Sequence, residues 1–225
     1  MALKYPKAVR AIHINMLLAL PPDPKKSPQK YARYQKKDYD ERDLKNMERT
    51  NWFAAHERGY QRLQETKCVT LGYGLHDSPV AILAWFVGKL KTWTDDYPWT
   101  KEELINWTFM HYQGSPSAAM QIYKEALAVL NNDPDSMVKR YVTQPVGGSV
   151  FPKEVRSHTI FKLLRLIISW QIWMSPREWM EETYNIQFWR QKDGGGHFAA
   201  WEQPEALVND LRDFFGADGP AFGKH

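Results

Sequence analysis

Strand-like alternation of apolar residues occurs in three short stretches of this 225-residue chain, and a long helical region separates the first from the other two. The three stretches are 9–16, 140–151 and 184–189. Parallel strands need long crossover connections, so this arrangement predicts an α/β fold with a parallel sheet. Three strands and their crossovers cannot cover both faces of such a sheet. We therefore expect an incomplete parallel sheet with a helical insertion after its first strand.

Local signals predict where the helices begin. Ser78 and Pro79 provide a capping residue and a first-turn proline for one helix. Thr100 and Glu103 form a capping box for the next, and a further helix begins near Ser117. The other expected elements are a helix end over 1–5, a loop over 19–40 and one long helical segment over 41–66. The expected domains are a core remnant over 1–19, a helical cap over 20–137 and a C-terminal core over 138–225.

Composition excludes several classes of protein. The net charge of +4 comes from 30 basic and 26 acidic residues. A solvated loop explains the main basic cluster, because nucleic-acid binding would need a longer basic face, and we exclude nucleic acid as a partner. The lysines of that cluster are Lys25, Lys26, Lys30, Lys36 and Lys37. Cys68 is the only cysteine, which rules out an intrachain disulfide and fits a reducing, cytoplasmic location.

No membrane span or leader is expected within the chain. The apolar stretch 159–173 is too short to cross a bilayer and contains Lys162 and Arg165. No signal peptide begins at Met1.

His197 is the strongest candidate for a catalytic residue. It follows three consecutive glycines, between the predicted strand at 184–189 and a helix that begins at Pro204. Glycines permit positive φ, so such a loop can display an imidazole at its tip. A flexible turn with a surface histidine would explain a Gly-Gly-His tripeptide taken by itself. The strand before the loop and the helix after it favour a catalytic base.

A histidine base needs a carboxylate that holds its tautomer. Glu154 follows the predicted strand at 140–151, which is where such an acid is expected. Asp193 lies closer in the sequence. Three further acids compete from a segment that we expect to be helical and solvated: Glu178, Glu181 and Glu182. The residues by themselves leave these alternatives open.

Several segments together resemble the epoxide hydrolases of the microsomal and fungal type. They are ERGYQRLQETK (57–67), LGYGLHDSPVAILAWFVGKLKTWTDD (71–96), SAAMQIYKEAL (117–127), FPKE (151–154) and GGGHFAAWEQPEAL (194–207). The resemblance extends over most of the chain in the family's order. It implies the C-terminal part of an α/β-hydrolase fold with a helical cap inserted. It also implies hydrolysis of an epoxide to a vicinal diol through an alkyl-enzyme ester, with water as second substrate and no cofactor or metal.

The resemblance assigns roles to four residues of this chain. Tyr60 and Tyr123 match the cap tyrosines that donate hydrogen bonds or protons to the epoxide oxygen. A phenol suits this role because its pKa of about 10 keeps it protonated at neutral pH. Glu154 matches the acid, and His197 matches the base that activates water.

The chain departs from the family at the nucleophile. The family's nucleophilic aspartate, with a histidine-glycine-proline loop that stabilises the oxyanion, precedes the strand that we predict at 9–16. The chain begins after both, so we expect a fragment that is inactive as given. A membrane anchor in a preceding segment, which some family members carry, stays an alternative.

The chain also departs from the family in a spacing. Glu154 and His197 are 43 residues apart, roughly 17 more than the resemblance leads us to expect. We expect the excess, near 156–172, to be translated non-coding sequence such as a retained intron. An extra helix packed on the sheet is the alternative.

Two rival functions remain from the sequence. One is another capped α/β-hydrolase, such as a dehalogenase or an esterase. The other is a non-catalytic relative that binds a partner, for example by docking its sheet edge on a second copy and forming a homo-oligomer.

Overall fold

The computed structural model describes residues 1–114, 116–132, 140–154 and 176–223. Within these ranges the strands form one parallel sheet in the order β1 (Ile12–Ile14), β2 (Val142–Val150), β3 (Tyr184–Gln191). Ile12 pairs with Val146 of the central strand, and Gly147 pairs with Phe188 on its other side. The prediction of an α/β fold with a small parallel sheet is confirmed.

The strands differ in detail from their predicted extents. β1 is shorter than the stretch 9–16. β2 continues through Pro145 and Gly147, two residues that disfavour a regular strand. The pairing with β3 shifts its register between Val142 and Pro145 and again beside Gly147. Such irregularities accommodate a proline, which has no N–H to donate to the ladder.

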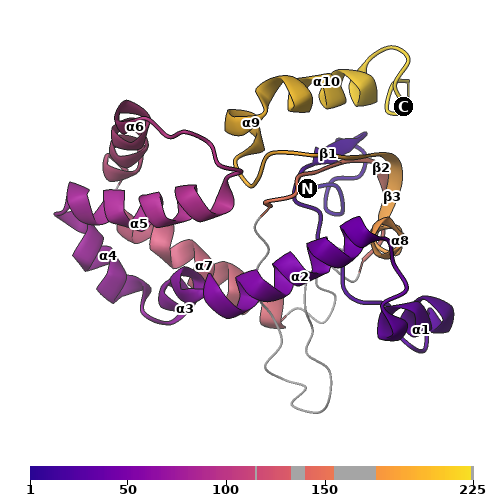
Figure 1. The fold of residues 1–225 in the computed structure, drawn as a ribbon, viewed down its shortest axis with the longest axis horizontal. Helices are drawn as coiled ribbons and strands as arrows, with labels where there is room; N and C mark the ends of the chain where they lie inside the picture. The colour runs from indigo at the N-terminus through magenta and orange to yellow at the C-terminus, as the bar shows by residue number, and fades with distance from the viewer. Residues whose placement is uncertain (115, 133–139, 155–175, 224–225) are drawn as a thin grey trace.

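The structure describes a long helical stretch between β1 and β2. Its helices are α1 (Pro28–Lys36), α2 (Glu41–His56), α3 (Gly59–Thr66), α4 (Cys68–His76), α5 (Pro79–Trp93), α6 (Lys101–Tyr112) and α7 (Pro116–Asn132). After β2 come α8 (Arg177–Met180), α9 (Ala199–Glu202) and α10 (Pro204–Phe215). In Figure 1, α4, α5 and α6 lie at the end of the molecule away from the strands, while α10 lies above the sheet.

Two predicted caps are present. The Ser78 hydroxyl accepts a hydrogen bond from the Ala81 amide at 3.1 Å. The Thr100 hydroxyl accepts a hydrogen bond from the Glu103 amide at 3.2 Å, and the Glu103 carboxylate accepts one from the Thr100 amide at 2.8 Å. These interactions fix the first turns of α5 and α6.

Three local predictions were wrong. The stretch 1–5 forms turns and no helix, with the Lys4 and Tyr5 amides both bonded to the Met1 carbonyl. The predicted loop at 19–40 contains α1, which long-range packing supports because Tyr34 lies edge-on to Trp179 at 5.2 Å. The single helix expected over 41–66 divides into α2 and α3 just before Gly59, a residue that disfavours a helix interior.

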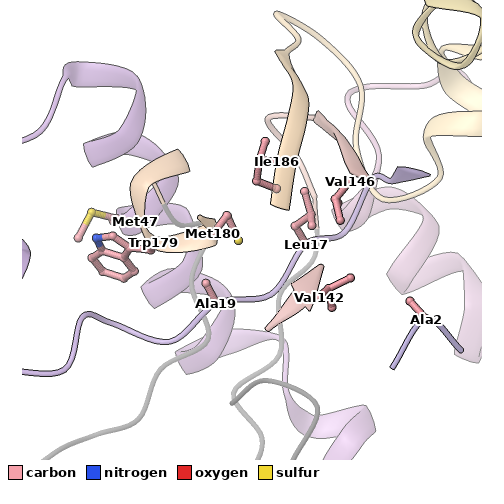
Figure 2. Packing of buried hydrophobic residues seen from close by; sticks show 9 residues of the cluster. All are labelled: Ala2, Leu17, Ala19, Met47, Val142, Val146, Trp179, Met180 and Ile186. Atoms are coloured by element: carbon pink, nitrogen blue, oxygen red, sulfur yellow. The ribbon is translucent and has the colours of Figure 1, made fainter. Parts of the chain in front are cut away.

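One hydrophobic cluster lies against the sheet. Strands β2 and β3 contribute Val142, Val146 and Ile186 to it, while Met47 on α2 and Trp179 on α8 pack from the helices. Figure 2 shows these side chains with the remaining members of the cluster, Ala2, Leu17, Ala19 and Met180. Burial of this apolar surface joins α2 and α8 to the sheet.

A buried polar network joins α10 to the same strands. The Ser149 hydroxyl of β2 donates to the fully buried Asp210 carboxylate at 2.6 Å, and His13 Nε2 lies 3.1 Å from that hydroxyl oxygen. Arg190 and Lys192 bond the same carboxylate at 2.7 and 2.8 Å. Because the serine proton points to Asp210, the serine oxygen can only accept from His13, which is the reverse of an activated nucleophile.

A second cluster holds the cap helices together. Its buried residues are Cys68, Leu75, Ile82 and Met120, from α4, α5 and α7. No helix among the residues that the structure describes is both long and apolar enough to cross a bilayer. The predicted insert near 156–172 and the apolar stretch 159–173 lie outside the described residues. The predicted domain boundaries at 19/20 and 137/138 stay predictions.

Candidate active site

The loop between β3 and α9 carries His197 and needs its glycines. Gly195 has a φ of +94°, which non-glycine residues rarely adopt. A Cβ at Gly196 would lie 2.3 Å from the Trp93 carbonyl oxygen. Glycine at both positions lets the loop approach the end of α5, and the His197 amide donates to that same carbonyl at 2.9 Å.

Glu154 is the carboxylate that contacts His197. It follows β2, is 1% exposed, and its Oε1 is hydrogen-bonded to Nδ1 of the imidazole. A parallel bridge between Lys153 and Gly196 places the two loops side by side. With Nδ1 held in this way, Nε2 is the nitrogen left to face a reactant.

The competing acids have other partners. The Asp193 side chain is 91% exposed and bonds Arg42 at 2.7 Å. Glu178 bonds Arg33 at 2.7 Å, and Glu182 bonds Lys30 at 3.1 Å. Of the acids that the sequence left open, Glu154 is the one that the structure places on His197.

Tyr60 and Tyr123 come together from α3 and α7. Their ring centroids are 5.9 Å apart and the ring planes are almost perpendicular, at 84°. Burial raises the pKa of both phenols, and for Tyr60 the neighbouring Tyr123 phenol adds to the increase. Both hydroxyls are therefore protonated at neutral pH and can donate hydrogen bonds.

Trp93, which the sequence analysis missed, connects the phenols to the histidine. Its indole is buried at the end of α5, with its ring centroid 5.0 Å from that of Tyr60 and 5.4 Å from the imidazole of His197. Phe198 stacks on the indole at 6.3 Å. The only available signal was its place in the segment 71–96, because nothing local shows that residue 93 meets residue 197.

Lys89 was missed as well. Its Nζ lies 3.7 Å from the ring centroid of Trp85 and 5.2 Å from that of Tyr60, and it donates to the Trp85 carbonyl at 2.8 Å. Burial lowers the pKa of Lys89 to about 8. A cationic ammonium therefore lies beside a candidate oxygen-activating tyrosine.

Neither a hollow beside α2 nor a metal site adds to these residues in the part of the chain that the structure describes. A hollow of about 510 Å³ is lined by α2 and by the ends of β2 and β3, among them Arg42, Lys45 and Lys192, and by none of the four candidate residues. Among the residues that the structure describes, no group of three or more His, Cys, Asp or Glu side chains is arranged to hold a metal ion.

The fold and this arrangement define an α/β-hydrolase with a helical cap. The structure of the Aspergillus niger epoxide hydrolase matches with a TM-score of 0.70 and 26% identity, over 91% of this chain and 45% of that one. The juvenile hormone epoxide hydrolase of Bombyx mori matches in fold, with a TM-score of 0.74 and 23% identity over 94% of this chain and 49% of that one.

Sequence comparison agrees with the structural matches. Epoxide hydrolase 1 of Sus scrofa is 30% identical over 196 residues, which are 79% of this chain and 39% of that protein. No family model matches the chain. The chain belongs to the epoxide hydrolase family of the α/β-hydrolase superfamily. It spans about two fifths of the length of the curated relatives it matches.

Proposed function

We propose that this chain supplies the oxygen-activating and water-activating groups of an enzyme that hydrolyses epoxides to vicinal diols. One observation carries the proposal: Tyr60 and His197 contact the same indole, Trp93, while Tyr123 adjoins the first and Glu154 bonds the second. Residues from 60 to 197 thus meet in one cluster. The substrate is an epoxide, water is the co-substrate, and the lone buried Cys68 suits a reducing compartment such as the cytoplasm.

The first step is opening of the epoxide ring. A carboxylate oxygen attacks one epoxide carbon, the bond from that carbon to oxygen breaks, and an alkyl ester forms. Tyr60 and Tyr123 donate to the oxygen as it becomes an alkoxide, and one phenol gives it a proton. The raised pKa of each phenol keeps that proton in place until the oxygen becomes more basic.

The second step is hydrolysis of the ester. Nε2 of His197 accepts a proton from water, and the resulting hydroxide adds to the ester carbonyl. Collapse of the adduct expels the second diol oxygen as an alkoxide, which takes the proton of the added hydroxide, so the diol leaves and the carboxylate is restored. The imidazolium gives its proton to the phenolate that the first step left. Glu154 holds Nδ1 and stabilises the imidazolium that forms between these events.

The attacking carboxylate is not one of the four proposed residues. In the family that this chain resembles, this carboxylate lies ahead of the strand that corresponds to β1. Upstream sequence that encodes a glycine-aspartate-tryptophan turn would supply it.

An assay with a styrene-type epoxide tests the proposal. We expect no diol from the 225-residue chain and measurable diol from a chain extended by a family-type segment that carries the nucleophilic aspartate. In the extended chain, the double change Tyr60→Phe and Tyr123→Phe should lower the rate by about 10² to 10⁴. The change His197→Gln should leave the alkyl ester unhydrolysed, detectable by mass spectrometry as an adduct of the mass of the epoxide.

Matched controls are available on the cap. Tyr73, which is 78% exposed, and the exposed His76 serve as Tyr73→Phe and His76→Gln, both with unchanged activity. Full activity of the double tyrosine variant would contradict the proposal. Diol formation by the 225-residue chain that depends on His197 would show that its own residues supply the nucleophile. Binding of the epoxide without turnover by the extended chain would instead support a non-catalytic relative.

One observation favours a second candidate, dehalogenation by the same kind of covalent step. A halide leaving group needs N–H donors, and the buried indole N–H groups of Trp93 and Trp107 have no acceptor among the residues that the structure describes. Release of bromide from a bromoalkane by the extended chain would establish this activity. We place it second because the paired phenols serve an oxygen leaving group better.

A further inference from the structure

Two carboxylates join the cap to the histidine loop by reciprocal hydrogen bonds. The Asp95 carboxylate, just beyond α5, accepts from the Gly195 amide at 3.0 Å. The Glu202 carboxylate, on α9, accepts from the Asp95 amide at 2.6 Å and from the Gly196 amide at 3.0 Å. Each segment therefore supplies both a carboxylate and an amide to the contact with the other.

These bonds satisfy consecutive amides of the loop that displays the imidazole. The Gly195 amide bonds Asp95, the Gly196 amide bonds Glu202, and the His197 amide bonds the Trp93 carbonyl at 2.9 Å. Because three successive amides are hydrogen-bonded, the backbone of the loop is fixed, and this fixes the direction in which the His197 side chain leaves it. The close approach of the loop to Trp93 leaves no room for a Cβ at Gly196, so the contact is tight as well as polar.

The chemistry of the two acids suits holding amides better than it suits proton transfer. An ionised carboxylate accepts several hydrogen bonds at once, and bonds to a charged acceptor are stronger than those between neutral groups. Lys153 lies 3.6 Å from the other oxygen of Asp95 and balances its charge. Neither acid bonds the imidazole, whose carboxylate partner is Glu154.

We propose that Asp95 and Glu202 are positioning residues that act as a clamp between the cap and the histidine loop. The clamp sets the direction of the His197 side chain, and it makes the orientation of that side chain depend on the docking of the cap end of α5. The positioning role of Asp95 and Glu202 rests on the proposed function of His197 as a base. The hydrogen bonds of the clamp do not depend on it.

Amide hydrogen exchange measured by NMR on the 225-residue chain tests the clamp without any turnover. With Glu202→Gln, we expect exchange of the Asp95 and Gly196 amides to become at least ten times faster, because one carboxylate acceptor is lost. With Asp95→Asn, the Gly195 amide should respond in the same way. The central-strand amide of Val146 should keep its rate in both variants.

Each variant has a matched control next to it. Asp96→Asn changes the exposed neighbour of Asp95, whose φ of 54° asparagine tolerates, and Glu205→Gln changes an exposed glutamate in the first turn of α10. Both controls should leave all four amides unchanged. Unaltered exchange in Glu202→Gln, or an equal rise that includes Val146, would overturn the proposal.

A second measurement separates positioning from simple loop stability. The ¹⁵N shifts of the His197 imidazole report which nitrogen carries the proton. In the unchanged chain, the Glu154 contact should favour the Nδ1–H tautomer, and loss of the clamp should mix the two tautomers. A pure Nδ1–H tautomer in both variants would contradict a positioning role. A failed epoxide assay with this pattern intact would refute the proposed function and leave the clamp established.

Discussion

Burial separates the carboxylates that organise this molecule from those that face water. Glu154 and Asp210 are almost completely inaccessible, and each is bonded to groups from distant parts of the chain. Asp193 is closer to His197 in sequence but lies in solvent. Sequence spacing narrowed the acid to several candidates. Choosing among them required knowing which carboxylate is enclosed, and that depends on residues far away in the chain.

Asp210→Ala should destabilise the chain by about 3 kcal/mol. The change leaves the Ser149 hydroxyl and the Arg190 and Lys192 cations without their shared acceptor. Asp213→Ala is the matched control, since Asp213 also bonds Arg190 but is half-exposed. The control should cost less than about 1 kcal/mol. Urea unfolding measures both free energies, and equal values would contradict this account of the network.

Stability should fall as the pH falls below about 6.5, the ordinary pKa of histidine. Burial, aided by Lys192, lowers the pKa of His13 despite the opposing effect of Asp210. In this window the unfolded chain binds a proton at residue 13 that the folded chain does not, so acid favours unfolding. The free energy of unfolding at pH 7.5, 6.5 and 5.5 measures the slope. His13→Gln should reduce it, and an identical slope in that variant would show that another group is responsible.

At the scale of helices and loops, local signals predicted where helices begin better than they predicted where helices are interrupted. The predicted caps at Ser78 and Thr100 were confirmed. They could be predicted because each joins residues only three positions apart. The break before Gly59 and the helix α1 were not predicted. α1 is strongly polar and depends on packing of Tyr34 against Trp179, which lies far along the chain. The apolar periodicity of one segment cannot predict a contact with a residue so far along the chain.

Thr100→Ala should destabilise the chain by about 1 kcal/mol. The change removes the hydroxyl that accepts from the Glu103 amide at the start of α6. Thr92→Ala is a useful control, because that hydroxyl only bonds a carbonyl within its own helix at 2.9 Å. Thermal unfolding compares the two variants. A larger loss at Thr92 than at Thr100 would contradict the importance of the capping box.

Gly196→Ala should destabilise the histidine loop by about 1–3 kcal/mol. The added Cβ would meet the backbone oxygen of Trp93 at 2.3 Å, and backbone on both sides must move. Gly194→Ala is the control, since its Cβ would lie 3.3 Å from a side-chain oxygen of Asp95, which needs to move by only a few tenths of an ångström. Unfolding free energies, with the tryptophan fluorescence of the folded state, report both changes. Equal effects at the two glycines would refute the steric explanation.

At the scale of the whole molecule, the two outer strands of the sheet matter most for association between chains. β1 pairs with β2 on one edge, and β3 pairs with β2 on the opposite side of the sheet, so each outer strand has one edge without a strand partner among the residues that the structure describes. Exposed strand edges promote association between chains. We expect the 225-residue chain to self-associate as its concentration rises, measured by sedimentation. A monomer at every concentration would contradict this expectation.

The fold class was predictable because it depends on the order of strand-like and helical periods, which is a property of the whole sequence. The placement of His197 on a glycine loop between a strand and a helix was predictable from local sequence, and its role as a base stays a prediction. The part that Trp93 plays was not predictable, because its indole matters only through contact with residues 60 and 197. The same holds for Glu202 and Asp95, which are 107 residues apart.

The distance in sequence across the clamp has a consequence for biogenesis. Ribosomes release a chain from its N-terminus, so α5 and Asp95 emerge long before the glycines at 195 and 196. Contacts that close such long loops form late, because the chain loses conformational entropy before the stabilising contacts are made. The cap can therefore serve as a template on which the last part of the chain is ordered. Mutations that slow maturation of the cap should then leave newly made protein with a disordered imidazole, even when the finished structure is unchanged.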